Sequence, residues 1–362
     1  MKKILVYGLS CMYGGVEAFI LNYVNHLPKD KYTVDLVVMN SIPAYLKDKL
    51  TRKAEIHIVP ERIKNPVRYS RKVDEIVRTG NYDILWCNFC TLSDITWLKA
   101  GKKHKIPVRI AHSHNSENMG GKLVLVSHLQ HKKVISKYAT HFFACSEIAG
   151  KFMFGDDILK QDNYSLINNA IETDKYAFDE MTRREVRKAL DIDEKIVVGN
   201  VGRLHFQKNH GFLIEIFAEF HKKYPCSVLM LVGDGELRET IENQIEQLGI
   251  KDSVLLMGNR SDVNQLMQAM DLFFMPSKFE GLPVSAIEAQ SAGLPCLFAD
   301  TITEQVKVTD AVKFESLNVP SQKWVGDMEK LLKEPRRNTS AQIIAAGYDI
   351  EENAEHIFER FL

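Results

Sequence analysis

The chain has 362 residues, 45% of them hydrophobic and 26% charged, which is typical of globular proteins and long enough for two domains. Its formal charges cancel, its six unevenly spaced cysteines make no disulfide framework, and no apolar stretch approaches the ~18 residues of a transmembrane helix. The apolar run at 4–9 is also shorter than the roughly 7–15 residues of a signal-peptide core. We therefore expect a cytoplasmic protein whose membrane contact, if any, is peripheral.

The first half alternates short apolar runs with amphipathic stretches of helical spacing. The predicted strands are 3–8, 32–39, 54–59, 84–87, 108–111, 141–145 and 164–167. The predicted helices are 16–27, 41–51, 66–79, 93–104 and 124–138. The polar segment 168–172 resembles a turn, and we expect the chain to cross between domains there.

The same alternation restarts after this segment. The predicted strands are 195–201, 227–232, 254–257, 272–275 and 295–299, and the predicted helices are 210–223, 237–248, 263–270, 284–292 and about 350–362. Strands that alternate with helices predict an α/β fold with parallel sheets, here two Rossmann-like domains. Such domains facing one another bind their ligand in a central cleft, at the carboxyl ends of the strands.

The balanced net charge hides a difference between the two halves. Residues 1–170 hold 25 Lys and Arg against 15 Asp and Glu, whereas residues 171–362 hold 22 against 32. A cationic half suits a negative partner such as a membrane surface, nucleic acid or a phosphorylated substrate. Solubility alone is the alternative. Nucleic acid is disfavoured because the basic clusters have no interleaved aromatic residues and no binding motif is present.

The stretch SKFEGLPVSAIEAQSAGLPC, at 277–296, sets two glutamates around a predicted helix start. Pro283 suits the first helical position, and Gly281 lets the backbone approach a ligand closely. The N-terminus of the helix offers N–H groups to an anion, while Glu280 and Glu288 can only accept hydrogen bonds, as sugar hydroxyls require. A nucleoside diphosphate sugar has these features. Two solvated glutamates beside a plain loop are the alternative.

Two further pairs of residues follow predicted strands. Arg203 and Lys208 come after a buried strand, so their charges reach its carboxyl end, where paired cations suit a diphosphate leaving group. A salt bridge to a neighbouring carboxylate is the alternative. Gly14 and Gly15 precede a helix, and their backbone could approach donor phosphates or an acceptor. A simple tight turn explains them equally well.

Several segments resemble, in order, the motifs of one enzyme family. The stretch at 277–296 resembles the E-x7-E signature of retaining GT-B glycosyltransferases, and more narrowly of glycosyltransferase family 4. Five other segments resemble further motifs of this family. They are GNVGRLHFQKNHGFLIEIF (the Arg and Lys motif), LVGDGELRETIE (a strand and helix), VLLMGNRSDV (the base-binding loop), LINNAIETDKYAF (the interdomain crossing) and YGGVEAFILN (the glycine-rich loop). The resemblance covers essentially the whole chain.

This resemblance implies a domain division and a role for each matching residue. The acceptor-binding domain would be 1–170 with a C-terminal helix at about 345–362, and the donor-binding domain would be 171–344. The implied catalytic residues are Glu280, Arg203, Lys208 and His114. The implied donor-binding residues are Gly15, Gly202, Asn259, Arg260, Gly281, Leu282, Val284 and Glu288, and Gly14 and His112 are implied contacts of the sugar or acceptor.

Two histidines end the strand 108–111, where the family carries a histidine that touches the transferred sugar. We favour His114 over His112, although the His-Ser-His order leaves the register open. We expect the two side chains to alternate between faces, so that only one of them meets the sugar. Two polar loop histidines without a ligand are the alternative.

A metal site is not expected. Cys87 and Cys90 have ligand-like spacing, with His128 and His131 as further candidates, but buried thiols are common and no second cysteine pair completes a zinc site. The Asp-x-Asp element of metal-using GT-A enzymes is missing, and GT-B relatives generally work without a metal.

The expected function is retaining, metal-independent transfer of a hexose or N-acetylhexosamine from a nucleotide sugar, expected to be a UDP-sugar, to a glycan or lipid-linked acceptor. The setting would be surface polysaccharide or glycoconjugate synthesis, with no cofactor and with the basic domain at the inner face of an anionic membrane. A nucleotide-sugar epimerase and a non-catalytic glycan-binding partner are the alternatives. A dehydrogenase is disfavoured because Gly8, Gly14 and Gly15 do not form G-x-G-x-x-G.

Overall fold

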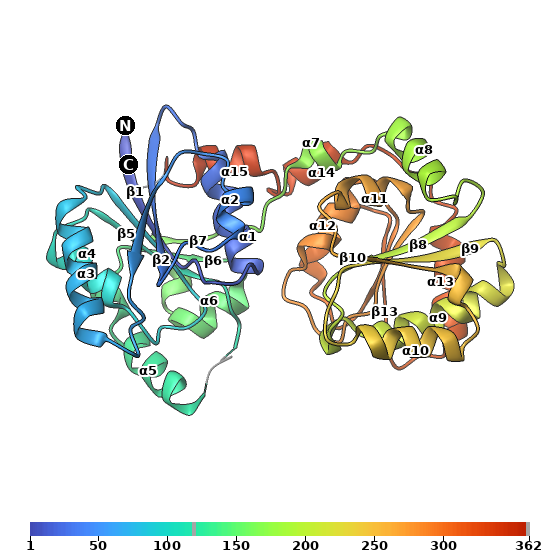
Figure 1. The fold of residues 1–362 in the computed structure, drawn as a ribbon, viewed down its shortest axis with the longest axis horizontal. Helices are drawn as coiled ribbons and strands as arrows, with labels where there is room; N and C mark the ends of the chain where they lie inside the picture. The colour runs from blue at the N-terminus through green and yellow to red at the C-terminus, as the bar shows by residue number, and fades with distance from the viewer. Residues whose placement is uncertain (118–120, 360–362) are drawn as a thin grey trace. The chain divides into compact units, whose positions relative to one another are not determined.

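The computed structural model describes residues 1–117 and 121–359. It contains two compact units, Met1–Ala170 with Ile350–Leu362 and Ile171–Asp349. Each unit is a parallel sheet with helices on both faces, which confirms the predicted α/β class (Figure 1). None of the described helices is long and apolar enough to cross a membrane.

The first unit has a seven-stranded sheet in the order β3-β2-β1-β4-β5-β6-β7. Its strands are β1 (Lys2–Tyr7), β2 (Tyr32–Met39), β3 (Glu55–Val59), β4 (Ile84–Phe89), β5 (Val108–Ser113), β6 (His141–Ala144) and β7 (Tyr164–Leu166). Ile4 of β1 pairs with Val34 on one side and Ile84 on the other. Because the strand order reverses between β1 and β4, the loops after these strands flank the switch point where α/β folds bind ligands.

Helices cover both faces of this sheet. They are α1 (Gly15–His26), α2 (Tyr45–Lys49), α3 (Pro66–Thr79), α4 (Thr96–Lys103), α5 (Lys122–Lys132), α6 (Glu147–Phe154) and α15 (Ile350–His356). Alternate residues of β1 enter opposite layers, since Ile4 and Val6 pack with α1 and α15 whereas Leu5 packs with α3 and α4. The last helix, α15, therefore completes the core of the first unit by packing on α1.

The second unit has a six-stranded parallel sheet in the order β10-β9-β8-β11-β12-β13. Its strands are β8 (Ile196–Val201), β9 (Ser227–Val232), β10 (Val254–Gly258), β11 (Leu272–Met275), β12 (Cys296–Ala299) and β13 (Val312–Glu315). The order reverses between β8 and β11, so the second switch point lies there.

The helices of the second unit also form two layers. They are α7 (Thr173–Tyr176), α8 (Glu180–Ala189), α9 (His210–Lys223), α10 (Arg238–Gln247), α11 (Val263–Ala269), α12 (Val284–Ser291), α13 (Ser321–Leu331) and α14 (Ser340–Ala345). One apolar cluster joins α9 and α13 to the sheet, and another joins α11, α12 and α14. Ile171 and Asp349, at the two ends of this unit, pair in an isolated parallel bridge.

The helical regions differ from the prediction in two ways. The predicted helix 124–138 is too long, because α5 ends at Lys132 and a 3₁₀ turn, Ile135–Lys137 (η1), follows with Ile135 buried in the core. The helices α6, α7, α8, α13 and α14 were not predicted. The helices α6, α7 and α14 are short, and α8 has few apolar residues, so that no apolar periodicity stands out.

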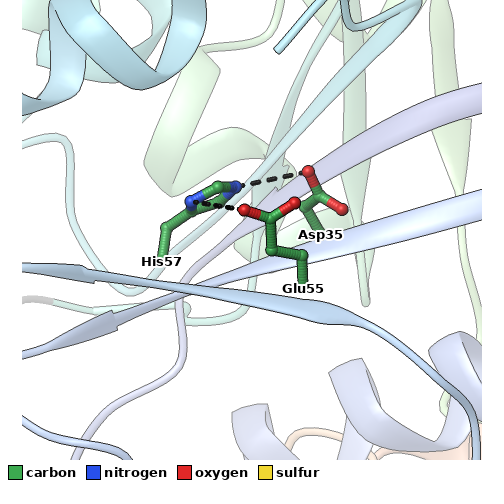
Figure 2. A group of neighbouring side chains, drawn as sticks. All are labelled: Asp35, Glu55 and His57. Carbon is green, nitrogen blue, oxygen red and sulfur yellow. Dashed lines mark hydrogen bonds and ion pairs between the residues drawn. The ribbon is translucent and has the colours of Figure 1, made fainter. Parts of the chain in front are cut away.

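A charged cluster lies on β2 and β3, at one edge of the first sheet (Figure 2). Nε2 of His57 lies 3.2 Å from Oδ2 of Asp35, and Nδ1 lies 3.7 Å from Oε1 of Glu55. Oδ2 of the buried Asp35 also lies 2.9 Å from Nζ of Lys3 and accepts a 2.7 Å hydrogen bond from Tyr82. Burial raises the pKa of Asp35, but the contacts with His57, Lys3 and Tyr82 outweigh it and lower that pKa.

We predict that Asp35→Asn destabilises the first unit by about 3 kcal/mol at pH 7, because it leaves Lys3 and His57 without their buried anion. A lowered carboxyl pKa stabilises the fold above the unfolded pKa of about 3.9, and this contribution is lost as pH falls through the folded pKa. Urea unfolding followed by the fluorescence of Trp86 and Trp97 should therefore distinguish variant from wild type at pH 7, and the difference should shrink as the pH falls below the unfolded pKa of Asp35.

The matched control is Glu75→Gln, which removes the carboxylate of an exposed pair with Lys72. It should cost less than about 1 kcal/mol at any pH. Equal stability of Asp35→Asn and wild type at pH 7 would contradict the role given to this cluster.

Candidate active site

Two loops at the carboxyl edge of the second sheet carry most of the predicted site residues. β8 and β11 are parallel neighbours, with Gly199 in register with Phe273. The chain segments that follow them, 202–209 and 276–283, therefore leave the sheet side by side. The first contains the 3₁₀ helix Phe206–Lys208 (η3), and the second leads into α12.

Lys208 and Glu280 form an ion pair between these loops. Nζ of Lys208 lies 2.6 Å from Oε1 of Glu280, and both side chains are largely buried, 16% and 9% exposed. Nε2 of Gln207 donates to the other oxygen, Oε2, over 3.2 Å, and to the carbonyl of Phe279 over 2.9 Å. Both oxygens of Glu280 are therefore held by neighbours on the loop after β8.

Backbone contacts lock the same two loops together. The N–H of Lys278 donates to the carbonyl of Gln207 over 2.8 Å, and Nδ2 of Asn209 donates to the carbonyl of Pro276 over 3.1 Å. Asn209 has a φ of 57°, a left-handed conformation that asparagine tolerates better than most residues. These contacts fix the position of Glu280 before any ligand arrives.

The helix α12 begins directly after this ion pair. Its first residue is Val284, and Pro283 occupies the N-cap, one position earlier than predicted, with an extended ψ of 117°. No side chain caps this N-terminus. The first N–H groups of the helix thus point toward the loop of Gly281 and Leu282, an arrangement that could receive an anion beside Glu280.

Glu288 lies in α12 and has one strong partner. The hydroxyl of Tyr176, from α7, donates to Oε1 of Glu288 over 2.6 Å. Burial raises the pKa of Glu288, although the hydrogen bond from Tyr176 and the charge of Lys175 oppose the rise. The carboxylate is thus oriented by Tyr176 at a position about one helical turn beyond the anion site.

Arg203 occupies a different position from Lys208. Its side chain is 70% exposed, and its guanidinium lies 3.1 Å from Oε2 of Glu236. His205 contacts the other oxygen of Glu236 at 3.3 Å. Both predicted cations therefore form salt bridges, which is the alternative considered from the sequence. The partner of Lys208 is Glu280, the first glutamate of the E-x7-E stretch, whereas the partner of Arg203 is Glu236, outside that stretch.

The remaining donor-side residues lie along the same sheet edge. Asn259 and Arg260 are exposed and follow β10, where the Arg260 guanidinium pairs with Asp262. The loops after β8 and β9 pack closely, because a Cβ on Gly233 would lie only 2.1 Å from the carbonyl oxygen of Gly202. Gly202 therefore lies where the backbone of the loop after β8 comes close to that of the loop after β9, and not beside open space.

Gly14 and Gly15 stand at the start of α1 in the first unit. Gly14 is the N-cap, and no atom lies within 4 Å of a Cβ built on Gly15. Glu17, which is buried, accepts a 3.0 Å hydrogen bond from the N–H of Ser10, and its Oε2 lies 3.2 Å from a Cβ built on Gly14. A carboxylate this close disfavours a phosphate at Gly14 and suits a hydroxyl, whereas Gly15 leaves room for either.

The rings of His112 and His114 stack on one side of the end of β5, with centroids 4.2 Å apart. The expectation that they alternate between faces is wrong, because residues two apart in a strand point to the same face. Nδ1 of the fully buried His112 accepts from Trp86 over 3.2 Å, and Nε2 of the half-buried His114 donates to Oδ1 of Asn88 over 2.9 Å. Burial lowers the pKa of His114 to about 3, so the ring is neutral and its Nδ1 is an acceptor.

One group of metal-ligating residue types gathers within the described ranges, namely Asp35, Glu55 and His57 (Figure 2). The carboxylate of Asp35 faces Nε2 of His57, and that of Glu55 faces Nδ1 on the other side of the ring. A cation bound to one of these nitrogens would therefore have only one of the two carboxylates beside it. The ammonium of Lys3 already occupies Asp35. This cluster fits an internal salt-bridge network better than a metal site.

Four site neighbours were missed in the sequence. They are Gln207, which holds Glu280; Tyr176, which holds Glu288; Asn88, which holds His114; and Glu17, which holds the glycine-rich loop. Gln207, Glu17 and Tyr176 lie inside quoted motifs, so their positions could have signalled a role. Asn88 acts from β4, and no local pattern points to it.

Comparisons with known proteins agree with this architecture. Residues 13–175 match Glycosyltransferase Family 4, and residues 182–349 match the glycosyl transferases of group 1. A Bacillus subtilis (strain 168) protein named as a glycosyltransferase, EpsF, is 30% identical over 97% of this chain and 94% of its own. The UDP-Gal:α-D-GlcNAc-diphosphoundecaprenol α-1,3-galactosyltransferase of Escherichia coli is 27% identical over 82% of this chain and 79% of its own. HepE of Anabaena, solved in complex with UDP, matches 99% of both chains with a TM-score of 0.78 at 20% identity.

Two parallel-sheet units with this strand order define a glycosyltransferase of the GT-B fold. The chain belongs to the family 4 glycosyltransferases, with a family 4 first unit and a group 1 second unit. It is a glycosyl-transferring enzyme, of the class that includes the hexosyltransferases.

We predict that Gln207→Ala lowers the turnover of glycosyl transfer by about tenfold, because small misplacements of an active-site group are costly. The affinity for the nucleotide alone should change less than twofold, since Gln207 contacts only the Glu280 side of the loop. Steady-state kinetics with a radiolabelled nucleotide sugar and calorimetric titration with its nucleotide measure the two effects.

The matched control is Gln244→Ala, which removes an amide that bonds the carbonyl of Gly211 on α9. Wild-type turnover by Gln207→Ala would show that Glu280 does not depend on this amide.

Proposed function

We propose that the protein is a retaining, metal-independent glycosyltransferase that moves a hexose or N-acetylhexosamine from a UDP-sugar to a glycan or lipid-linked acceptor in surface polysaccharide or glycoconjugate synthesis. The observation that carries this proposal is the grouping of Lys208, Glu280 and Glu288 around the start of α12. Two relatives support it by name: HepE was solved with UDP and with UDP-glucose, and the Escherichia coli enzyme is named for a UDP-Gal donor and a diphosphoundecaprenol-linked acceptor.

The donor diphosphate would bind between Lys208 and the N-terminus of α12. A diphosphate competes with Glu280 for Lys208, so donor binding would release Glu280 from its ion pair. Arg203 is exposed, and its pair with Glu236 is weak enough in solvent to exchange for a phosphate. The cations and helix N–H groups would stabilise the charge that develops on the leaving group, a task that a metal performs in other enzymes.

Two carboxylates would then bind the two sugar rings of the donor. Glu280, released from Lys208, would accept hydrogen bonds from hydroxyls of the transferred sugar, with the backbone of Gly281 and Leu282 nearby. Glu288 would accept from the ribose, oriented by Tyr176. Asn259 would lie at the base, together with Arg260.

The chemical step would be a front-face substitution. The bond from the anomeric carbon to the diphosphate oxygen breaks, and the bond to the acceptor oxygen forms on the same face. The acceptor proton passes to the departing diphosphate oxygen, so charge and atoms balance. No side chain is assigned as a nucleophile. In the first unit, the neutral His114 would accept a hydrogen bond from the transferred sugar through Nδ1, and Gly14 and Gly15 would border the acceptor and donor.

Peripheral contact with an anionic membrane at the inner face of the cell membrane also belongs to this proposal. Residues 118–146 contain no Asp or Glu, whereas they contain Lys122, Lys132, Lys133 and Lys137. A basic segment of this kind is attracted to anionic lipid by about 1 kcal/mol per residue.

The helix α5, in this basic segment, adds an exposed apolar side. Leu123, Val126 and Leu129, spaced three residues apart, are 87%, 52% and 50% exposed. Lys122 and Lys133 lie on the same side of the helix by its periodicity. An apolar strip flanked by lysines is typical of helices that lie in a membrane interface.

We predict that Glu280→Ala abolishes transfer and leaves UDP affinity nearly intact, whereas Glu288→Ala weakens UDP by about tenfold through loss of a charged hydrogen bond. Because burial raises the pKa of Glu288, wild-type affinity for uridine should also fall as the pH drops from neutral, and the fall should begin above the usual range of a glutamate carboxyl. Uridine carries no phosphate that titrates in this range, which makes it the suitable ligand for calorimetry.

Tyr176→Phe should move that fall in uridine affinity to higher pH, because it removes the hydrogen bond that lowers the pKa of Glu288. Normal turnover by Glu280→Ala would refute the donor-site assignment.

We also predict that replacing Leu123, Val126 and Leu129 by serine weakens binding to phosphatidylglycerol vesicles by at least tenfold in sedimentation assays. Vesicles of phosphatidylcholine alone should bind neither protein strongly, because attraction to the lysines is lost. The control is Met181→Ser, which removes an exposed apolar side chain from α8. Equal binding of the triple variant and wild type would exclude α5 as the contact.

A further inference from the structure

Two exposed phenylalanines lie beside Glu280. Phe206 is 57% and Phe279 is 49% exposed, and of the 18 phenylalanines in the chain these are the two that the described ranges leave exposed. Single exposed apolar side chains are ordinary on protein surfaces. Two exposed aromatic side chains on neighbouring loops of the candidate site call for a specific explanation.

The contacts between the two loops bring the two residues onto neighbouring segments of the chain. The N–H of Lys278 donates to the carbonyl of Gln207, and Nε2 of Gln207 donates to the carbonyl of Phe279. Nζ of Lys278 lies 3.7 Å from the centre of the Phe206 ring. The two phenylalanines therefore flank the hydrogen bond between Gln207 and Glu280, one from each loop.

Packing within the unit does not account for their exposure. The apolar clusters of the second unit enclose Phe273, Phe274 and Phe298 and leave out both Phe206 and Phe279. The ammonium of Lys278 lies over one face of Phe206, so a ligand would have to compete with Lys278 for that face. The proposed roles in binding diphosphate, ribose and base use neither ring.

The surroundings fit one class of ligand, a pyranose ring. Such a ring has an apolar face of C–H groups and a rim of hydroxyls. An aromatic side chain receives the C–H face by dispersion and by release of water, while carboxylates and amides bond the hydroxyls. Phe279 offers the first kind of surface, and Glu280 and Gln207 offer the second, in adjacent positions.

We propose that Phe279, with Phe206 beside it, forms a stacking platform for a pyranose ring bound at Glu280. This inference rests on the proposed function, because it takes Glu280 as the residue that binds sugar hydroxyls. The ring can belong to the donor hexose or to the saccharide of the acceptor. The chemistry of recognition is the same for both.

The test compares UDP with sugar-containing ligands in Phe279→Ala, Phe206→Ala and Phe279→Trp. Calorimetry with UDP-glucose, UDP-galactose and UDP-GlcNAc should identify a donor that binds Phe279→Ala about tenfold more weakly than it binds the wild type. This loss is at the upper end of the range for one aromatic contact. The affinity for UDP should differ less than twofold between the two proteins. Phe279→Trp should restore binding. Because Trp86, Trp97 and Trp324 are fully buried, the emission of the new indole should respond to the sugar ligand and not to UDP.

A second arm uses the methyl glycosides of glucose, galactose and N-acetylglucosamine at millimolar concentration in the presence of UDP. Loss confined to UDP-sugars assigns the platform to the donor, and loss confined to a glycoside assigns it to the acceptor; both support the inference. Met181→Ala, which removes an exposed apolar side chain from α8, should change none of these constants.

The inference is overturned if Phe279→Ala binds every sugar ligand as tightly as wild type, or if the wild-type protein binds no sugar ligand beyond its affinity for UDP. A wild-type protein that binds no UDP would instead refute the proposed function. In that case the glycoside arm, repeated without UDP, still decides whether the platform binds a saccharide.

Discussion

The parallel pairing of β8 with β11 is the constraint on which the donor side of this enzyme depends. These strands are neighbours although the chain visits β9 and β10 between them. Their carboxyl ends therefore deliver Lys208 and Glu280, far apart in the sequence, to one place. The hydrogen bonds of Gln207, the uncapped start of α12 and the position of Glu288 all follow from this meeting of two loops.

The charged side chains of the candidate site in the second unit are paired with one another. Lys208 and Glu280 neutralise each other in a largely buried pair, and Arg203 and Glu236 do the same in solvent. A buried charge without a partner is costly, so each group would keep its partner until a ligand with complementary charge and hydroxyls replaces it. The first unit, taken by itself, holds groups of a different kind, a neutral imidazole and a glycine-rich loop held by the buried Glu17.

The sequence was sufficient for the α/β class, the parallel strands and the separate motifs, because strand periodicity and glycine-rich turns are local signals. It could not supply the contacts that join motifs, such as Gln207 with Glu280 or Tyr176 with Glu288, because these depend on which strands are neighbours. The prediction for His112 and His114 was wrong because residues two apart in a strand point to the same face, and not to opposite faces. The polar helix α8 was missed because most of its side chains face solvent.

The placement of α15 has a consequence for synthesis on the ribosome. Domains of a multidomain chain usually fold in the order in which they emerge, N-terminal first. Here the core of the first unit includes Ile350, Ala354 and Phe358, which emerge after the whole of Ile171–Asp349. The unit that begins the chain is therefore completed last, and until then the apolar side of α1 that receives α15 stays open to solvent and to chaperones.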